Sequence, residues 1–374
     1  MDIAKYILTT PTRTRLKLGA AGVSLALLAT ACGPAAETAA PVGTETVEAG
    51  TADAASAEEA AAGLPLDFGS PLSICMRSAK VLVKSFTSLS GGASTMARDR
   101  RPEENEVRTW AWLQDELRAK AEAIAVSLRS GVLASDPVPG LDWNVGRLGA
   151  HMVAIPQFHL RAQDVFVGLP DVSNPAAVNQ FSEQTAADVG TSDPDELASI
   201  LPTAIEQLIA RLGDDGSTTA KWYEHDMTVL ELGGVVLSEL LLHHHDLARA
   251  TAQERGVAKI SNEQAQAAFR GLFVASPHVV NPHVARECQG VIHIFLTGSG
   301  GGEHWSTTIS GETAITTPGN PPVADFHTMA NPVELLLVTQ GRGHEVKALL
   351  TGQIVGIGRK PKLGLKSRNL YYSL

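Results

Sequence analysis

The sequence predicts a multidomain protein in which an all-α four-helix bundle is followed by a smaller α+β domain. From about Pro102 to Phe273, apolar residues recur every three or four positions, which is typical of amphipathic helices around one core. After about Pro282 the pattern changes to short alternating segments with turns, and helices follow the first strands. With 374 residues, the chain is long enough for both domains. We expect the bundle over 101–278 and the α+β domain over 283–374.

The first 32 residues are typical of an export signal. Basic residues precede the apolar segment 18–31, and small residues close it. Its end, Leu-Ala-Thr-Ala-Cys at 28–32, resembles a bacterial lipobox, which implies that the Cys32 thiol carries diacylglycerol. The alternative is a chance apolar helix that ends at a buried cysteine.

Residues 33–100 are predicted to form a flexible tether and an unassigned junction. The part from 33 to 63 is rich in Ala, Thr and Glu and lacks Lys, Arg and aromatic residues. Such a segment cannot bury enough apolar surface to offset its chain entropy. Met96 precedes a charged stretch that is typical of the start of an intracellular protein. A cytoplasmic protein that starts near Met96 is therefore the alternative to a membrane-anchored lipoprotein.

Composition excludes several classes of protein. The net charge of −10, from 30 basic and 40 acidic residues, repels phosphate backbones, so we expect no nucleic-acid partner. The apolar segment 18–31 is shorter than the roughly 20 residues of a membrane-spanning helix, which excludes a polytopic membrane protein. The three cysteines lack C-x-x-C spacing, which excludes a disulfide framework. Neither a G-x-S-x-G elbow nor a dinucleotide fingerprint is present.

The helices are expected in the following order. The first covers 107–128, and the second begins after an Asn144 cap and is kinked or ended by Pro156. A loop over 165–189 is long enough to be a lid or rim. Three more helices follow, which run from the Asp193 cap to Gly213, from Met227 to Ala250, and from the Ser261–Gln264 capping box to Phe273. The helix over 227–250 is the most apolar, so we expect it at the centre of the bundle.

The last part of the chain predicts one sheet. Apolar residues on both sides of 291–296 indicate a strand that is buried on both faces. The glycine run 298–302 is interpreted as a hairpin turn, because it lacks the lysine of a phosphate loop and a strand follows it. Further strands are expected at 305–309, 314–317, 324–328 and 353–358, short helices at 332–337 and 346–350, and a terminal amphipathic segment at 363–370.

One helix face could hold half of a metal site. Glu239 and His243 are four residues apart, so their side chains leave the same face about 6 Å apart, and Asp246 extends that face. A carboxylate and an imidazole at this spacing are typical ligands of a divalent metal. The flanking residues are strongly apolar, so we expect Glu239 to be buried and to need a cationic partner. His151, on the inner face of the second helix, is the third candidate ligand.

The other histidines favour structural roles. A histidine on an apolar helix face is more often a hydrogen-bonded core residue than a ligand, and this alternative stays open for His151 and His243. Consecutive residues of a helix diverge by about 100°, so His244 and His245 cannot both join His243 at one site. His159 is expected in the core or in a loop. The histidines expected on the surface are His225, His278 and His283.

Two motifs resemble the mycothiol-dependent maleylpyruvate isomerase family, whose metal-binding domain is a DinB-like four-helix bundle. The first is Trp143 followed by His151 eight residues later. The second is Glu239-x-x-x-His243, followed by Asp-Leu-Ala-Arg-Ala-Thr from Asp246. The resemblance covers about residues 100–275. It implies a divalent metal, preferentially zinc, that is held by His151, Glu239 and His243.

The C-terminal part resembles the second domain of that family, which is similar to sterol carrier protein type 2. The resemblance rests on turn glycines and apolar residues at 324–332, 340–342, 349–352 and 355–358. Arg342 matches an arginine that recurs in this domain, which implies a catalytic residue whose guanidinium binds a substrate carboxylate. The alternative is a surface arginine at a helix end.

The resemblance implies mycothiol as co-substrate and a metal-bound thiolate that adds to a small activated substrate. Two histidines and one glutamate leave a position on zinc open for such a ligand. Addition and release would make the protein an isomerase, and displacement of a leaving group an S-transferase. The alternative is a non-enzymatic lipoprotein, anchored through Cys32, that binds an apolar ligand in its C-terminal domain. Mycothiol is cytoplasmic and a lipoprotein is exported, so the two hypotheses conflict.

Overall fold

The computed structural model describes residues 109–164, 169–251, 259–298 and 302–372. All of them belong to one compact unit, Arg100–Leu374. The predicted signal segment with Cys32, the tether and Met96 lie outside the described residues. Within these ranges, no helix is long and apolar enough to cross a membrane.

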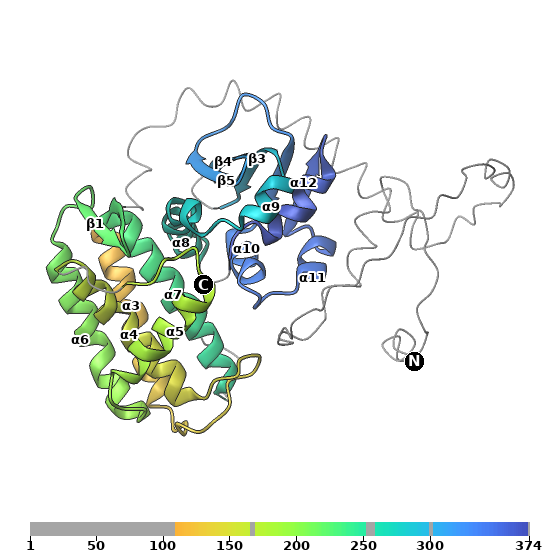
Figure 1. Cartoon of the computed structure of the whole chain (residues 1–374). Helices are drawn as coiled ribbons and strands as arrows, with labels where there is room; N and C mark the ends of the chain where they lie inside the picture. The colour runs from red at the N-terminus through yellow and green to blue at the C-terminus, as the bar shows by residue number, and fades with distance from the viewer. Residues whose placement is uncertain (1–108, 165–168, 252–258, 299–301, 373–374) are drawn as a thin grey trace, which may run out of the picture. The chain divides into compact units, whose positions relative to one another are not determined.

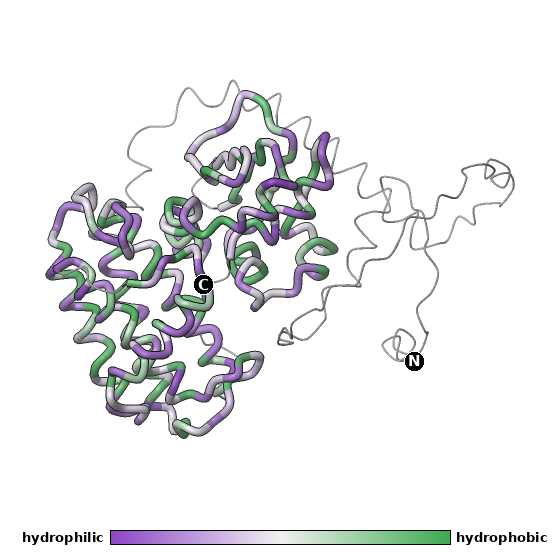
Figure 2. The backbone as a smooth tube through the Cα atoms, viewed as in Figure 1, coloured by the Kyte–Doolittle hydropathy of each residue, from purple (hydrophilic) through white to green (hydrophobic). Residues whose placement is uncertain are grey.

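Four long helices pack against one another as a bundle, and Figure 1 shows them in orange to green. They are α3 (Trp110–Leu128), α4 (Val145–Ala162), α6 (Pro194–Leu212) and α7 (Val229–Ala250). Hydrophobic and hydrophilic residues alternate along these helices (Figure 2), and the hydrophobic ones form the core. α7 contacts α3, α4 and the following helix α8 (Asn262–Ala275), in agreement with the central place predicted for it.

The predicted helix caps are largely confirmed. The Asn144 side chain accepts from the Arg147 amide at the start of α4, and Asp193 caps α6. Ser261 and Gln264 form the expected capping box of α8. The prediction that Pro156 could end its helix is wrong, because α4 continues to Ala162. Buried side chains on both sides of Pro156 hold the helix together despite the missing amide hydrogen.

A helix and a hairpin in the bundle region were not predicted. The expected loop over 165–189 contains helix α5 (Pro175–Ala187), which packs on α4 and begins at an Asn174 cap. Only three of its residues are buried, so its apolar periodicity is weak. A hairpin of β1 (Thr219–Trp222) and β2 (His225–Thr228) precedes α7. Met227 therefore lies in a strand, and the helix begins after a Thr228 cap.

The C-terminal part contains a five-stranded sheet in the order β5-β4-β3-β6-β7. β3 and β6 are parallel, and the other neighbouring pairs are antiparallel. The strands are β3 (Gly290–Leu296), β4 (Glu303–Ser310), β5 (Thr313–Pro318), β6 (Phe326–Ala330) and β7 (Ile354–Gly358). The helical elements around them are η4 (Ser276–Val279), α9 (Pro282–Glu287), α10 (Pro332–Thr339), α11 (Glu345–Leu350), α12 (Pro361–Lys366) and η5 (Ser367–Asn369).

The prediction that β3 is buried on both faces is confirmed only in part. Ile292 and Leu296 point to the side of the sheet that belongs to the two hydrophobic cores. On the other side, His293 is buried, whereas Val291 and Phe295 are only half-buried, and neither of these two belongs to a described core cluster. Alternation of apolar residues alone cannot tell a covered face from an open one.

The helical part and the sheet share a core. The larger hydrophobic cluster includes bundle residues together with Leu296, Trp305 and Leu336 of the C-terminal part. α7 and α8 approach very closely, since a Cβ on Gly271 would lie 2.4 Å from the Val235 nitrogen. Because glycine has no side chain, α8 can pack directly on the bundle, and the sheet follows α8 in the chain.

Candidate metal centre

α4 and α7 bring the three predicted ligands together. His151, Glu239 and His243 each offer one donor atom, and these atoms lie within 4.8 Å of one another. Within the described ranges, no other group of three or more His, Cys, Asp or Glu side chains meets this condition. The i,i+4 spacing on α7 supplies two of the donors, and α4 adds His151 from the neighbouring helix.

Contacts outside the centre orient both imidazole rings. Ser182 Oγ of α5 lies 3.1 Å from His151 Nδ1. Asp246 Oδ2 lies 3.4 Å from His243 Nδ1, at ion-pair distance but out of line for a hydrogen bond. His243 Nε2 lies 3.3 Å from Glu239 Oε2. The Nδ1 atoms thus face outer partners and leave the Nε2 atoms for the centre, as in many protein metal sites.

The pKa values of the two histidines move in opposite directions. Burial, together with the neighbouring His243, lowers the pKa of His151 to about 3, so this imidazole is neutral at neutral pH. Burial also acts to lower the pKa of His243, but Asp246 and Glu239 outweigh it and raise that pKa. A proton on His243 therefore partly neutralises the two carboxylates. A divalent cation would displace this proton on binding.

Glu239 differs from its prediction. The side chain is 33% exposed, so the expectation that its apolar neighbours bury it is wrong. The protein around the carboxylate nevertheless desolvates it, which acts to raise its pKa, while His243 outweighs this effect and lowers the pKa. The carboxylate is thus reachable from solvent and held ionised, and both properties are needed in a metal ligand.

Arg342 lies beside this centre rather than on the surface. The side chain is 18% exposed and pairs with Asp246, which is 1% exposed. Its Nε and Nη2 atoms donate to Asp246 Oδ2 at 3.2 and 3.0 Å, and Nη1 donates to the Gln340 carbonyl at 2.7 Å. The surface alternative for Arg342 is therefore wrong. Arg342, Asp246 and His243 form one chain of contacts that leads from the segment after α10 to the candidate ligands.

Three further side chains lie near the candidate ligands and were not predicted to have a role, namely Trp143, Arg147 and Ser182. The Trp143 ring centroid lies 5.1 Å from that of His151 and 6.0 Å from that of His243, so this residue packs on both candidate ligands. Arg147 lies over the Trp143 ring and pairs with Glu183 of α5. Trp143 belongs to a motif quoted above and could have been found from it. Ser182 could not, because its segment was predicted to be a loop.

The remaining histidines have other surroundings. His244 Nε2 lies 3.1 Å from Ser127 Oγ of α3, so its ring points away from the candidate ligands, as helix geometry predicts. His159 is buried, which agrees with a core placement. The surface prediction is wrong for His225 and His278, which are half-buried and stack with ring centroids 3.5 Å apart. His283 is exposed, as expected.

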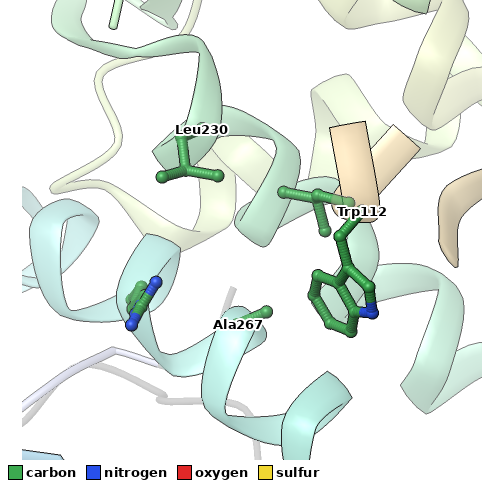
Figure 3. Close-up of a pocket in the computed structure, with 5 residues that line it drawn as sticks. Trp112, Leu230 and Ala267 are labelled. Atoms are coloured by element: carbon green, nitrogen blue, oxygen red, sulfur yellow. The ribbon is translucent and has the colours of Figure 1, made fainter. Parts of the chain in front are cut away.

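Two hollows elsewhere contain none of the candidate ligands. One, of about 10 Å³, is lined by Trp112, Leu230 and Ala267 (Figure 3) together with Leu113 and Arg270. It has room for about one water molecule. The other, of about 250 Å³, lies between α3 and α6 and is lined by Arg118, Glu122, Pro202, Thr203 and Glu206. The chemistry of the three donors, rather than cavity size, marks the candidate centre.

Comparison with known proteins gives slight likenesses only. No protein-family profile and no curated protein matches the sequence. Among solved structures, the mycothiol-dependent maleylpyruvate isomerase is 14% identical, with 65% of this chain and 91% of that chain covered and a TM-score of 0.36. Sterol carrier protein 2 like 2 from Aedes aegypti is 18% identical, with coverages of 28% and 94% and a TM-score of 0.25. With TM-scores below 0.5, these likenesses do not establish a shared fold or function.

Proposed function

We propose that this chain is a divalent-metal enzyme of the mycothiol-dependent maleylpyruvate isomerase type. In this proposal, residues 101–278 form a DinB-like bundle and residues 283–374 a sterol-carrier-like domain. The observation that carries the proposal is the convergence of two imidazoles and one carboxylate within 4.8 Å. The Trp143–His151 spacing and the motif after Glu239 support it independently, because they place the same residues in the family's ligand positions.

The donor set suits a catalytic metal. His151, Glu239 and His243 would hold the ion, and three protein ligands leave a tetrahedral zinc one position for a small molecule. When bound, zinc would lower the pKa of a thiol and keep it as thiolate at neutral pH. Asp246 holds the His243 ring by its outer nitrogen, which fixes the ligand's orientation.

Arg342 is the proposed substrate-binding residue. Its hydrogen bonds to Asp246 and Gln340 use the Nε hydrogen and one hydrogen of each terminal nitrogen, which leaves a second hydrogen on each terminal nitrogen. These hydrogens can donate to a carboxylate of maleylpyruvate. The mycothiol thiolate would then add to the conjugated double bond of the substrate, rotation would follow about the resulting single bond, and elimination would release the thiolate and the trans isomer. Displacement of a leaving group by the same thiolate would make the protein an S-transferase.

The test is loss of cis-maleylpyruvate on the purified full chain, with and without zinc and mycothiol. We expect turnover only when both are present. Turnover without thiol would contradict the proposal and point to metal-activated water. Arg342→Lys should lower turnover at unchanged zinc content, because lysine keeps the charge but loses the two-pronged geometry. Arg161→Lys, at an exposed position on α4 outside both motifs, is the matched control and should behave as wild type.

The cellular location is a second part of the proposal. The alternative is a protein that is anchored through Cys32 and binds an apolar ligand in its C-terminal domain. Labelling of cells with a palmitate analogue should mark the wild type and not Cys32→Ala if the chain is a lipoprotein. Absence of label from the wild type would favour a cytoplasmic enzyme that starts near Met96.

A further inference from the structure

A second group of histidines lies on the face of the sheet that is turned away from its hydrophobic cores. His293 of β3 is opposite His327 of β6 in the strand register, and His304 of β4 is diagonal to His293. His293 Nδ1 lies 3.1 Å from His327 Nδ1, and His293 Nε2 lies 2.9 Å from His304 Nδ1. The His304 ring also stacks on Phe295 at 4.5 Å, which fixes its orientation. These three rings form a continuous row across three neighbouring strands.

The position of the hydrogen on the His293 ring decides which of its two nitrogens can donate and which can accept. A neutral imidazole has one N–H and one lone pair. If Nε2 carries the hydrogen and donates to His304, then Nδ1 presents its lone pair on the side of His327 Nδ1. When His327 is the tautomer with its hydrogen on Nε2, both Nδ1 lone pairs can converge on one cation that lies off the line between the two nitrogens. The same tautomer, with its outer N–H held by a partner, is the usual arrangement of a metal-ligating histidine.

The surroundings of the row favour a cation. His293 is 6% exposed, and its two ring nitrogens face only the other two imidazoles. No ion pair joins any of the three rings to a carboxylate in the part of the chain that the structure describes. A neutral imidazole keeps one lone pair, which is available to a metal.

We propose that His293 and His327 bind a divalent transition-metal ion through their Nδ1 atoms, with His304 holding the His293 tautomer from the opposite side. A separation of 3.1 Å suits two adjacent ligands at the usual metal–nitrogen distance of about 2.0–2.1 Å. A donor set of imidazoles without carboxylates selects copper, nickel or zinc over magnesium or calcium, and copper(II) most strongly. His304 is exposed and His327 half-buried, so the ion and its remaining water ligands can reach the site from solvent.

The proposed site is independent of the bundle centre. The row lies on β3, β4 and β6, and it shares no residue with the group formed by His151, Glu239 and His243. A copper(II) titration of the full-length chain in the His243→Ala background therefore measures the sheet site after the bundle site has been disrupted. Failure of the bundle centre to bind metal would leave this measurement unaffected.

In that background we expect one copper(II) ion per chain, with an electron paramagnetic resonance signal typical of nitrogen ligands. Adding His327→Phe, which keeps an aromatic ring but removes the donor, should weaken copper binding at least tenfold. Adding His283→Ala, an exposed histidine of α9, is the matched control and should change nothing.

His304→Phe gives a second, milder test if His327→Phe disturbs the fold. This variant keeps both proposed ligands and should weaken binding less than His327→Phe does. Copper binding that is equal in the His243→Ala background with and without His327→Phe would overturn the proposal. The row would then be a chain of N–H···N hydrogen bonds between neutral histidines and no more.

Discussion

The two histidine clusters of this protein use the same side chain in opposite electrostatic settings. In the bundle, His243 lies between the carboxylates of Glu239 and Asp246, and its pKa is raised. In the sheet, His293 lies between two other imidazoles, and its pKa is lowered to about 4. The charge of a buried histidine is thus decided by what its two nitrogens face, and burial sets only the common tendency toward the neutral form.

Secondary structure explains why the clusters differ. On α7, residues four and three apart place a carboxylate on each side of one imidazole, so the helix itself supplies the compensating charge. On the sheet, neighbours come from different strands, and the register aligns histidine with histidine. The bundle cluster is therefore expected to exchange a proton for a metal, whereas the sheet cluster is expected to bind a metal without losing a proton at neutral pH.

The largest expected effect is the loss of a bundle ligand. His243→Ala should lower zinc affinity by more than the roughly 10–100-fold that loss of an outer partner costs. Competition with a chromophoric chelator on the full chain measures this affinity. His244→Ala is the control, because that ring contacts Ser127 and not the candidate ligands. Equal losses in the two variants would show that the wrong helix face has been identified.

Asp246→Asn is expected to have the next largest effect. The variant keeps the shape of the side chain but removes the charge that His243 Nδ1 and Arg342 both face. We expect zinc affinity to fall about 10–100-fold, as is typical for outer partners of metal-bound histidines. The same chelator competition measures it, with Asp226→Asn, an exposed residue of the hairpin, as control. Unchanged affinity in Asp246→Asn would mean that the carboxylate does not orient the ligand.

Acid should destabilise the metal-free protein through the sheet cluster. The pKa of His293 is about 4 in the folded chain and about 6.5 when unfolded, so the unfolded state binds more protons below pH 6.5. Above pH 6.5 this histidine therefore does not lower the free energy of unfolding. As the pH falls toward 4, it lowers the free energy of unfolding progressively, by up to about 1.4 kcal/mol per pH unit. Urea unfolding between pH 7 and 4.5 tests it. The slope should be smaller in His293→Phe, and an identical slope would show that His293 does not contribute.

The smallest expected effect on zinc affinity comes from Ser182, the uncharged partner of His151. Ser182→Ala removes the hydroxyl that lies 3.1 Å from His151 Nδ1. A hydroxyl orients the ring without adding charge, so zinc affinity should fall less than in Asp246→Asn, by under about tenfold. Ser199→Ala, at an exposed position on α6, is the control. A loss as large as that of Asp246→Asn would mean that orientation of the ring, rather than charge, dominates the outer contacts.

The sequence by itself determined the features that depend on residues close together in the chain. Caps such as Asn144 and Asp193 set helix starts within one turn, and the i,i+4 spacing of Glu239 and His243 placed two candidate ligands on one face. Helix α5 escaped prediction because its few buried residues leave almost no periodic signal. Glu239 was expected to be buried because its neighbours in the chain are apolar, although its exposure depends on how the helices pack around it.

Only the tertiary structure decided which distant side chains meet. Arg342 pairs with Asp246 across 96 positions of sequence, and this contact exists because the segment after α10 packs beside α7. His293 and His327 became neighbours through the parallel pairing of β3 with β6, and no spacing in the chain encodes that register. Local hydrogen bonding and side-chain periodicity are properties of short segments. Contacts between segments are fixed by the burial of apolar surface over the whole core, which no single motif determines.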